Sequence, residues 1–181
     1  MTEMHHDPDR RLRVLFLCTA NASRSQIAEA LLARKGRGRF DVASAGVMPA
    51  AAVHPMAIEA LREYGIDWTR QTPKGLGAVL GQHWDFVITV CERAKEACPA
   101  FPGRPVYADW GVPDPTAIED EVARRVAFRH VVHHMARRID LMLAVPMEKL
   151  MREAQEERLR AIGRVPDPDA VVPVTSQSVP Q

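Results

Sequence analysis

The sequence predicts a three-layer α/β/α fold, in which a four-stranded parallel sheet lies between helices and a helical extension follows at the C-terminus. Three observations predict it. Short apolar runs alternate with helical patterns along the chain, the first run leads through a polar loop straight into a helix, and 181 residues suffice for one domain with a substantial core. Such alternation implies right-handed crossovers, and open sheets of this kind bind ligands beyond the carboxyl ends of their strands.

Each element follows from its local pattern. Short apolar runs predict four strands, at residues 14–17, 40–45, 85–90 and 105–108. Apolar positions at helical spacing predict helices at residues 26–32, 55–64 and 92–97, a weaker glycine-interrupted helix at 72–81, and a long helix from residue 118. The core-facing positions expected on the long helix are Val122, Val126, Phe128, Val131, Val132, Met135 and Ile139.

Pro146 is expected to break or kink the long helix. We therefore expect a folded domain over residues 10–145 and an amphipathic helical extension over residues 146–163. Residues 164–181 lack periodicity and are expected to form a flexible tail. The sequence leaves open whether the extension packs on the domain or pairs with a second copy, so the oligomeric state is not predicted.

Composition excludes several classes of function. A formal net charge of +1 gives no electrostatic case for binding nucleic acid or an anionic membrane. Three cysteines, an odd number, suit a reducing compartment better than a disulfide framework. Residues 1–8 lack the apolar core of a signal peptide, and no run of about 18 apolar residues could span a membrane. We expect a soluble cytoplasmic protein.

The loop between the first strand and helix carries the clearest chemical signal. Cys18 is followed after five residues by Arg24 and Ser25. Backbone N–H groups of such a loop, the helix dipole and the arginine can bind a tetrahedral oxyanion and favour a thiolate at Cys18, which Ser25 could hydrogen-bond. A cysteine that merely ends a strand is the alternative, which the arginine at this spacing disfavours. The candidate oxyanion-binding residues are Thr19, Ala20, Asn21, Ala22, Ser23, Arg24 and Ser25.

Two further cysteines, Cys91 and Cys98, flank the short helix predicted after the third strand. Seven helical residues place them about 10.5 Å apart along the axis, whereas a disulfide needs Cα atoms within about 7 Å. They can pair only if the helix unwinds, which suggests a redox-driven switch. The alternative is two small apolar side chains on a buried helix face.

Asp114 lies between two prolines after the last predicted strand. A carboxyl group on such a stiff loop could serve as a general acid that protonates a departing oxygen. The alternative is a solvated aspartate in a turn.

The pattern Cys-Thr-x-Asn-x-x-Arg-Ser-Gln-x-Ala-Glu at residues 18–29, with Ser44-Ala45-Gly46 after the second strand, resembles the low-molecular-weight protein tyrosine phosphatase superfamily. It is most similar to the thioredoxin-coupled arsenate reductase branch, over about residues 12–140. The resemblance implies a low-molecular-weight phosphatase-like fold, arsenate as substrate and thioredoxin as external reductant, with no bound cofactor. Thr116-Ala117 stand where typical tyrosine phosphatases of the superfamily carry tyrosines.

The resemblance also implies roles for the site residues. Cys18 would attack arsenate bound by Arg24 while Asp114 acts as the acid; Cys91 and then Cys98 would carry the disulfide to thioredoxin. Three alternatives remain: a phosphatase that uses Cys18, Arg24 and Asp114 alone, a redox or arsenic sensor without turnover, and a reductase coupled to a low-molecular-weight thiol, which would leave Cys98 without a role.

The sequence departs from its relatives at two positions. Ala20 stands where they usually have glycine. Alanine would be strained there only if φ were positive, a conformation that the neighbouring Asn21 tolerates. Some relatives hold potassium under the loop, but Lys74 occupies the position of an acidic ligand, so we expect no potassium dependence. His130 and His134 share a helix face without further ligands nearby, so no metal site is predicted.

Overall fold

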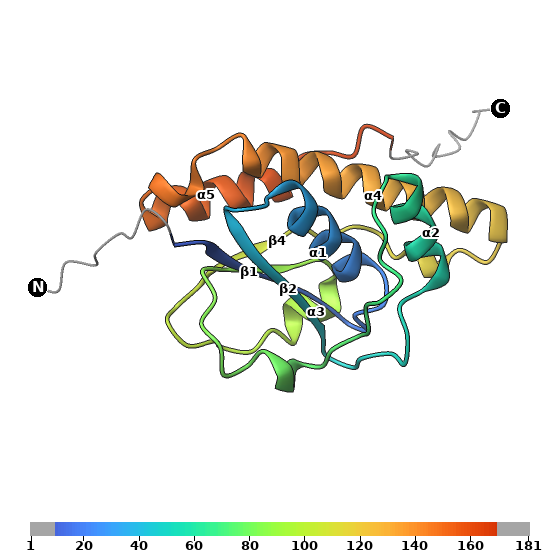
Figure 1. The fold of residues 1–181 in the computed structure, drawn as a ribbon, viewed down its shortest axis with the longest axis horizontal. Helices are drawn as coiled ribbons and strands as arrows, with labels where there is room; N and C mark the ends of the chain where they lie inside the picture. Colours follow the sequence, from blue (N-terminus) through green and yellow to red (C-terminus); the bar gives the residue numbers. More distant parts are fainter. Residues whose placement is uncertain (1–9, 170–181) are drawn as a thin grey trace, which may run out of the picture.

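The computed structural model describes residues 10–169 and has the predicted three layers (Figure 1). The sheet has the strand order β2-β1-β3-β4, and all neighbouring strands are parallel. The strands are β1 (Leu12–Cys18), β2 (Phe40–Gly46), β3 (Phe86–Thr89) and β4 (Val106–Asp109). The four predicted strands are thus confirmed.

Helices cover both faces of the sheet. They are α1 (Arg24–Lys35), α2 (Pro55–Glu63), α3 (Glu92–Glu96), α4 (Glu121–Leu143) and α5 (Arg152–Gly163), with 3₁₀ turns at Leu76–Ala78, Pro115–Ala117 and Met147–Lys149. Helices α1, α2, α4 and α5 contact one another on one side, and α3 lies apart from them against β1 and β3 (Figure 1). Since β1 is central and covered on both faces, Val14, Leu15, Phe16 and Leu17 are all buried.

Two helical predictions are wrong in detail. Residues 72–81 form only the 3₁₀ turn at Leu76–Ala78, because three glycines weaken any helix there and Gly75 instead bridges to β2. Val122 and Val126 are 69% and 39% exposed rather than in the core. The N-terminal part of α4 meets α2 through charged side chains, such as Arg129 with Glu63 at 2.6 Å, so its valines face solvent.

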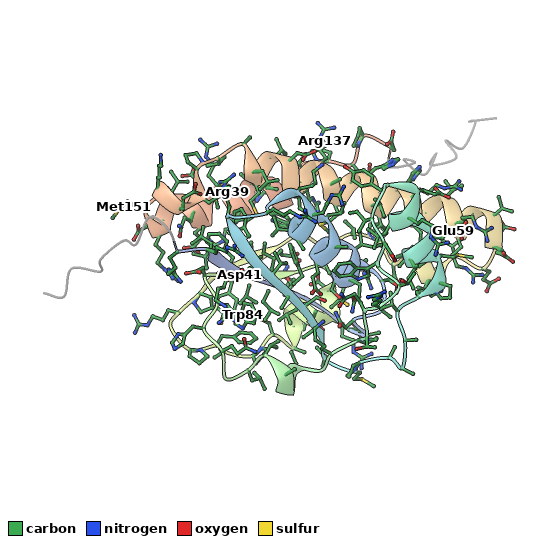
Figure 2. The ribbon with its side chains drawn as sticks, in the orientation of Figure 1. Arg39, Asp41, Glu59, Trp84, Arg137 and Met151 are labelled. Atoms are coloured by element: carbon green, nitrogen blue, oxygen red, sulfur yellow. The ribbon has the colours of Figure 1, made fainter. Side chains whose placement is uncertain are left out.

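Arg39 stabilises the end of α4. Its guanidinium donates to the carbonyl oxygens of Leu143 and Val145 at 2.8 and 2.9 Å and pairs with Glu148 at 3.0 Å. Figure 2 shows this side chain just before β2, beside the helical layer. The first contact satisfies the Leu143 carbonyl at the end of the helix, while the Val145 carbonyl also accepts from the Met147 N–H at 2.8 Å.

The C-terminal extension packs on the domain. The indole N–H of Trp110 donates to the Leu159 carbonyl at 2.9 Å, and the buried Arg138 donates to the carbonyl oxygens of Trp110 and Gly163 at 2.6 and 3.0 Å. A Cβ on Gly163 would overlap the carbonyl oxygen of Asp109, so only glycine lets α5 approach β4 this closely.

Some expectations fall outside the described residues. The signal-peptide prediction rests on residues 1–8, and residues 170–181 make up most of the predicted tail; both segments lie beyond the described range. Among residues 10–169, no helix is both long and apolar enough to cross a membrane.

Candidate active site

The loop from Cys18 to Ser25 joins β1 to α1 at the carboxyl end of the sheet, and the segment after β2 holds it from outside. Backbone N–H groups of that segment donate to four loop carbonyls at 2.8–3.1 Å; the donor–acceptor pairs are Val47–Cys18, Met48–Thr19, Ala50–Ala20 and His54–Ala22. In a trans peptide unit the C=O and the next N–H point in opposite directions. The loop therefore turns its carbonyl oxygens outward and its N–H groups inward, as an oxyanion cradle requires.

Asn21 is the residue on which this loop turns. Its φ is +50°, as its side chain permits, whereas Ala20 has no positive φ and the glycine-to-alanine change costs no strain there. The Asn21 amide group donates to Ser25 Oγ and Ser44 Oγ at 2.9 and 2.8 Å. Gly46 lets the loop approach β2, because a Cβ there would lie 2.7 Å from the Thr19 carbonyl oxygen.

The Cys18 sulfur lies on the cradle floor and is almost fully buried. Ser25 Oγ lies 2.7 Å from it, and the Asn21 N–H donates to it at 3.1 Å. Burial raises the pKa of the Cys18 thiol, and these hydrogen bonds only partly oppose that effect. The expectation of a thiolate favoured by the loop is therefore wrong for this state of the site: desolvation outweighs the donors around the sulfur.

Arg24 and Asp114, far apart in the sequence, meet at the rim. Arg24 donates to the Val112 carbonyl at 3.0 Å, and its guanidinium lies 3.3 Å from Asp114 Oδ2. The other Asp114 oxygen accepts from the N–H and hydroxyl of Thr116 at 3.0 and 2.7 Å. The Asp114 carboxyl group is thus oriented beside the cradle, as a group that donates to a departing oxygen must be.

Cys91 is the second thiol of the site. Its sulfur lies 3.4 Å from Thr19 Oγ1, and Cys91 shares with Cys18, Arg24 and Asp114 a cavity of about 460 Å³. Cys98 is not in this cavity: α3 separates it from Cys91, and it lines a different cavity. All three thiols are free. Of the five proposed catalytic residues, the structure brings four together around one cavity and leaves Cys98 outside it.

Sequence reasoning missed His54, which also lines the cradle cavity. Its Nδ1 accepts from the Met56 N–H at 3.1 Å, which caps α2, and its ring stacks on Phe128 with 4.7 Å between centroids. In the neutral ring the proton is therefore on Nε2. In the sequence, His54 directly precedes Pro55 at the start of a predicted helix. That position indicates a helix cap and does not reveal that the side chain lines the cavity.

The residues under the loop are joined by hydrogen bonds and an ion pair. Ser44 Oγ donates to Glu29 Oε2, and Lys74 Nζ lies 3.6 Å from the same oxygen. Burial raises the pKa of Glu29, while Ser44 and Lys74 oppose that rise. Within residues 10–169 no cluster of three or more His, Cys, Asp or Glu side chains could hold a metal. His134 pairs instead with Asp167 at 3.2 Å.

Comparisons with known proteins agree with this geometry. Residues 13–157 match the family model of low molecular weight phosphotyrosine protein phosphatase. An arsenate reductase of Halalkalibacterium halodurans is 38% identical over 127 residues, which are 70% of this chain and 91% of that protein. A solved arsenate reductase in the oxidised state is 30% identical with a TM-score of 0.62, covering 73% of this chain and 96% of that one. The Corynebacterium glutamicum thioredoxin-dependent arsenate reductase is 31% identical with a TM-score of 0.56, covering 74% and 61%.

Proposed function

Because this chain belongs to the low-molecular-weight phosphotyrosine protein phosphatase family, we propose that it applies the family's cradle to arsenate, which it reduces to arsenite with thioredoxin as the reductant. The observation that carries the proposal is the position of Cys91, which lines the cradle cavity together with Cys18. A phosphatase has no use for a second thiol there, because water resolves its covalent intermediate. The solved relatives named as arsenate reductases support the same choice.

Arsenate binds first, in the cradle. The inward N–H groups of the loop and the Arg24 guanidinium neutralise its negative charge, with the α1 N-terminus behind them. Arg24 is already held at the rim by Val112 and Asp114, so little side-chain freedom is lost when the anion arrives.

The Cys18 sulfur then attacks arsenic. Because burial raises the pKa of Cys18, the thiol proton passes to an oxygen of the bound arsenate as the S–As bond forms. Asp114 supplies the proton for the oxygen that leaves as water. The product is a covalent adduct between Cys18 and pentavalent arsenic.

Reduction follows when the Cys91 thiolate attacks the Cys18 sulfur. The S–As bond breaks and its electron pair stays on arsenic, so arsenite leaves and a Cys18–Cys91 disulfide forms. Cys98 next attacks Cys91, which releases Cys18 and leaves a Cys91–Cys98 disulfide for thioredoxin to reduce. Cys98 now lies beyond α3, so this step needs α3 to unwind.

Phosphate has nearly the shape of arsenate, so the cradle alone does not separate them. We therefore expect weak phosphomonoesterase activity from Cys18, Arg24 and Asp114 alongside reduction. A sensor without turnover is disfavoured, because the carboxyl group of Asp114 held beside the cradle would have no task.

A coupled assay with arsenate, thioredoxin, thioredoxin reductase and NADPH tests the proposal. Wild type is expected to oxidise NADPH only when arsenate is present, and Cys91→Ser to be inactive. Cys98→Ser is expected to release about one arsenite per enzyme and then stop. Absence of NADPH oxidation, together with phosphomonoester hydrolysis that survives Cys91→Ser, would identify a phosphatase instead.

A further inference from the structure

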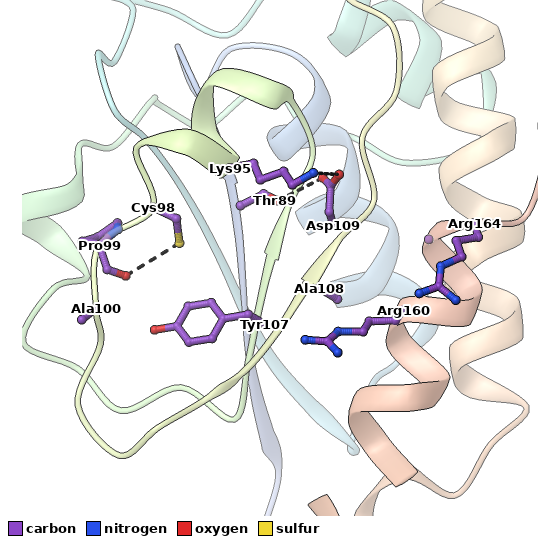
Figure 3. Close-up of a pocket in the computed structure, with 11 residues that line it drawn as sticks. Thr89, Lys95, Cys98, Pro99, Ala100, Tyr107, Ala108, Asp109, Arg160 and Arg164 are labelled. Carbon is purple, nitrogen blue, oxygen red and sulfur yellow. Dashed lines mark hydrogen bonds and ion pairs between the residues drawn. The ribbon is translucent and has the colours of Figure 1, made fainter. Parts of the chain in front are cut away.

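A second cavity, of about 750 Å³, lies on the far side of α3 from the cradle, between the loop after α3, β4 and α5 (Figure 3). Its size falls within the range of pockets that bind small molecules, roughly 300–1,000 Å³. The cavity separates into a charged side and an apolar side. The lining residues that matter here are Lys95, Cys98, Tyr107, Asp109, Arg160 and Arg164.

The charged side is positive. Lys95, Arg160 and Arg164 line the cavity, and Asp109 is the one carboxylate among the described residues of its lining; Glu156, outside the lining, lies 2.6 Å from Arg160. Asp109 is already engaged: it lies 3.6 Å from Lys95 Nζ and accepts from Thr89 Oγ1 at 3.0 Å. Figure 3 shows the two arginines reaching from α5 toward the cavity. A group with negative charge is therefore the complementary occupant.

The apolar side is built around Tyr107. Tyr107 is 38% exposed, and its hydroxyl accepts from the Phe101 N–H at 3.2 Å, which fixes the ring in place. Pro99, Ala100 and Ala108 extend this surface, and Cys98 lies beside it in Figure 3. The Tyr107 ring can stack against a flat apolar group of a ligand whose negative group lies on the charged side of the cavity.

We propose that this cavity binds a small organic anion, an apolar ring system that carries a carboxylate, sulfonate or phosphate group, and that the bound molecule covers Cys98. The match to the family model ends at residue 157, so Arg160 and Arg164 lie outside the family match. Where the thiol relay proposed above operates, an occupant would hold Cys98 beside β4 and slow its attack on Cys91. This regulatory consequence rests on the proposed function; the binding itself does not.

The test uses 1-anilinonaphthalene-8-sulfonate, whose fluorescence reports binding, and N-phenyl-1-naphthylamine, which has the same rings without the sulfonate. Cys18→Ser/Cys91→Ser leaves Cys98 as the single thiol, and iodoacetamide measures its access. At saturation the anionic probe is expected to slow alkylation of Cys98 about tenfold, because a molecule enclosed in the cavity covers the thiol. The neutral probe is expected to protect much less.

Arg160→Ala/Arg164→Ala is expected to weaken binding of the anionic probe about tenfold and to leave the neutral probe unaffected. Arg158→Ala is the matched control, since Arg158 is exposed on the same helix and does not line the cavity. Arg160 is exposed, and among residues 10–169 it pairs with Glu156 four residues earlier on α5, so its loss does not threaten folding. If the double thiol variant does not fold, peptide mapping of the three thiols in wild type reports the same protection.

Equal binding of the anionic probe by wild type and the arginine variant, or binding without protection of Cys98, would overturn the proposal. Neither measurement involves arsenate or thioredoxin, so a failure here is separate from a failure of the reductase assay. Where both hold, the anionic probe is also expected to slow thioredoxin-driven turnover of wild type several-fold, and to spare the turnover of the arginine variant at the same concentration.

Discussion

The Ser25 hydroxyl lies 2.7 Å from the Cys18 sulfur, close enough to donate a hydrogen bond to it when the cysteine is a thiolate. Asn21 donates its amide N–H to Ser25 Oγ at 2.9 Å, so the hydroxyl proton of Ser25 is free to point at the sulfur. The serine thus acts as a donor that favours the thiolate, against the burial that disfavours it.

Ser25→Ala removes this donor and is expected to raise the pKa of Cys18 further. Since the thiolate is the reactive form, alkylation of Cys18 by iodoacetamide near pH 7.5 is expected to slow roughly tenfold, with the rate recovered at higher pH. Ser23→Ala is the control, because Ser23 caps α1 without a side-chain hydrogen bond. A pH profile unchanged in Ser25→Ala would contradict a role for Ser25 as donor to the thiolate.

Asp114→Asn is expected to lower arsenate turnover by about 10²–10⁴-fold, the usual effect of losing a general acid. Asparagine keeps an oxygen that can accept from Thr116, so the loop should hold its shape. Weak phosphatase activity supplies an internal control: hydrolysis of phenyl phosphate should fall far more than that of p-nitrophenyl phosphate, whose leaving group needs little protonation. Equal losses on both substrates would argue for a positioning role.

Potassium is expected to leave the catalytic rate of wild type unchanged, because Lys74 Nζ already places a positive charge 3.6 Å from Glu29. The measurement is a titration of potassium against sodium at constant ionic strength. A several-fold rise in rate would show that a cation site persists beside the lysine.

Lys74→Met is expected to make stability more sensitive to pH. Burial raises the folded-state pKa of Glu29, and Lys74 counteracts that rise, so without the lysine this pKa goes higher still. A carboxyl group with a raised folded-state pKa loses stability as the pH increases through that pKa. The deficit in free energy of unfolding should therefore be larger at about pH 7.5 than at about pH 4.5, with Lys74→Arg near wild type. A deficit equal at both pH values would exclude this linkage.

Gly163→Ala is expected to lower the free energy of unfolding by about 1–3 kcal/mol, as overpacking does. Helix propensity alone would favour alanine, so the sign separates the two effects. The added Cβ would overlap the Asp109 carbonyl and lie 2.9 Å from Trp110 Cδ1, so a change in tryptophan fluorescence should accompany the loss. Gly77→Ala, where a Cβ meets nothing within 4 Å, is the control in urea denaturation.

The elements that sequence predicts best here are those set by local pattern. The predicted strand β1 and the helix that follows the Cys18–Arg24 loop are confirmed, because a buried central strand and its turn into a helix leave few alternatives. Asn21 likewise takes the left-handed conformation that its side chain allows. The resemblance placed Asp114 near the loop, and the 3.3 Å contact with Arg24 agrees.

What sequence missed depends on contacts between distant segments. The raised pKa of Cys18 results from how deeply the sulfur is buried, which spacing does not reveal. Docking of α5 through Trp110 and Arg138 involves partners 49 and 25 residues apart in the chain. The outward anchoring of the loop carbonyls by residues 47–54 is a backbone contact, and backbone contacts leave no mark on residue identity.

Because the thiols lie on two sides of α3, other molecules reach them by separate routes. Cys18 and Cys91 open into the chamber that receives the anion, and Cys98 opens into another, with its own entrance between β4 and α5. A molecule can therefore reach Cys98 without passing Arg24, and it can do so while an anion still occupies the cradle. The five residues of α3 therefore separate the two cavities, and any disulfide exchange between Cys91 and Cys98 must take place across this helix.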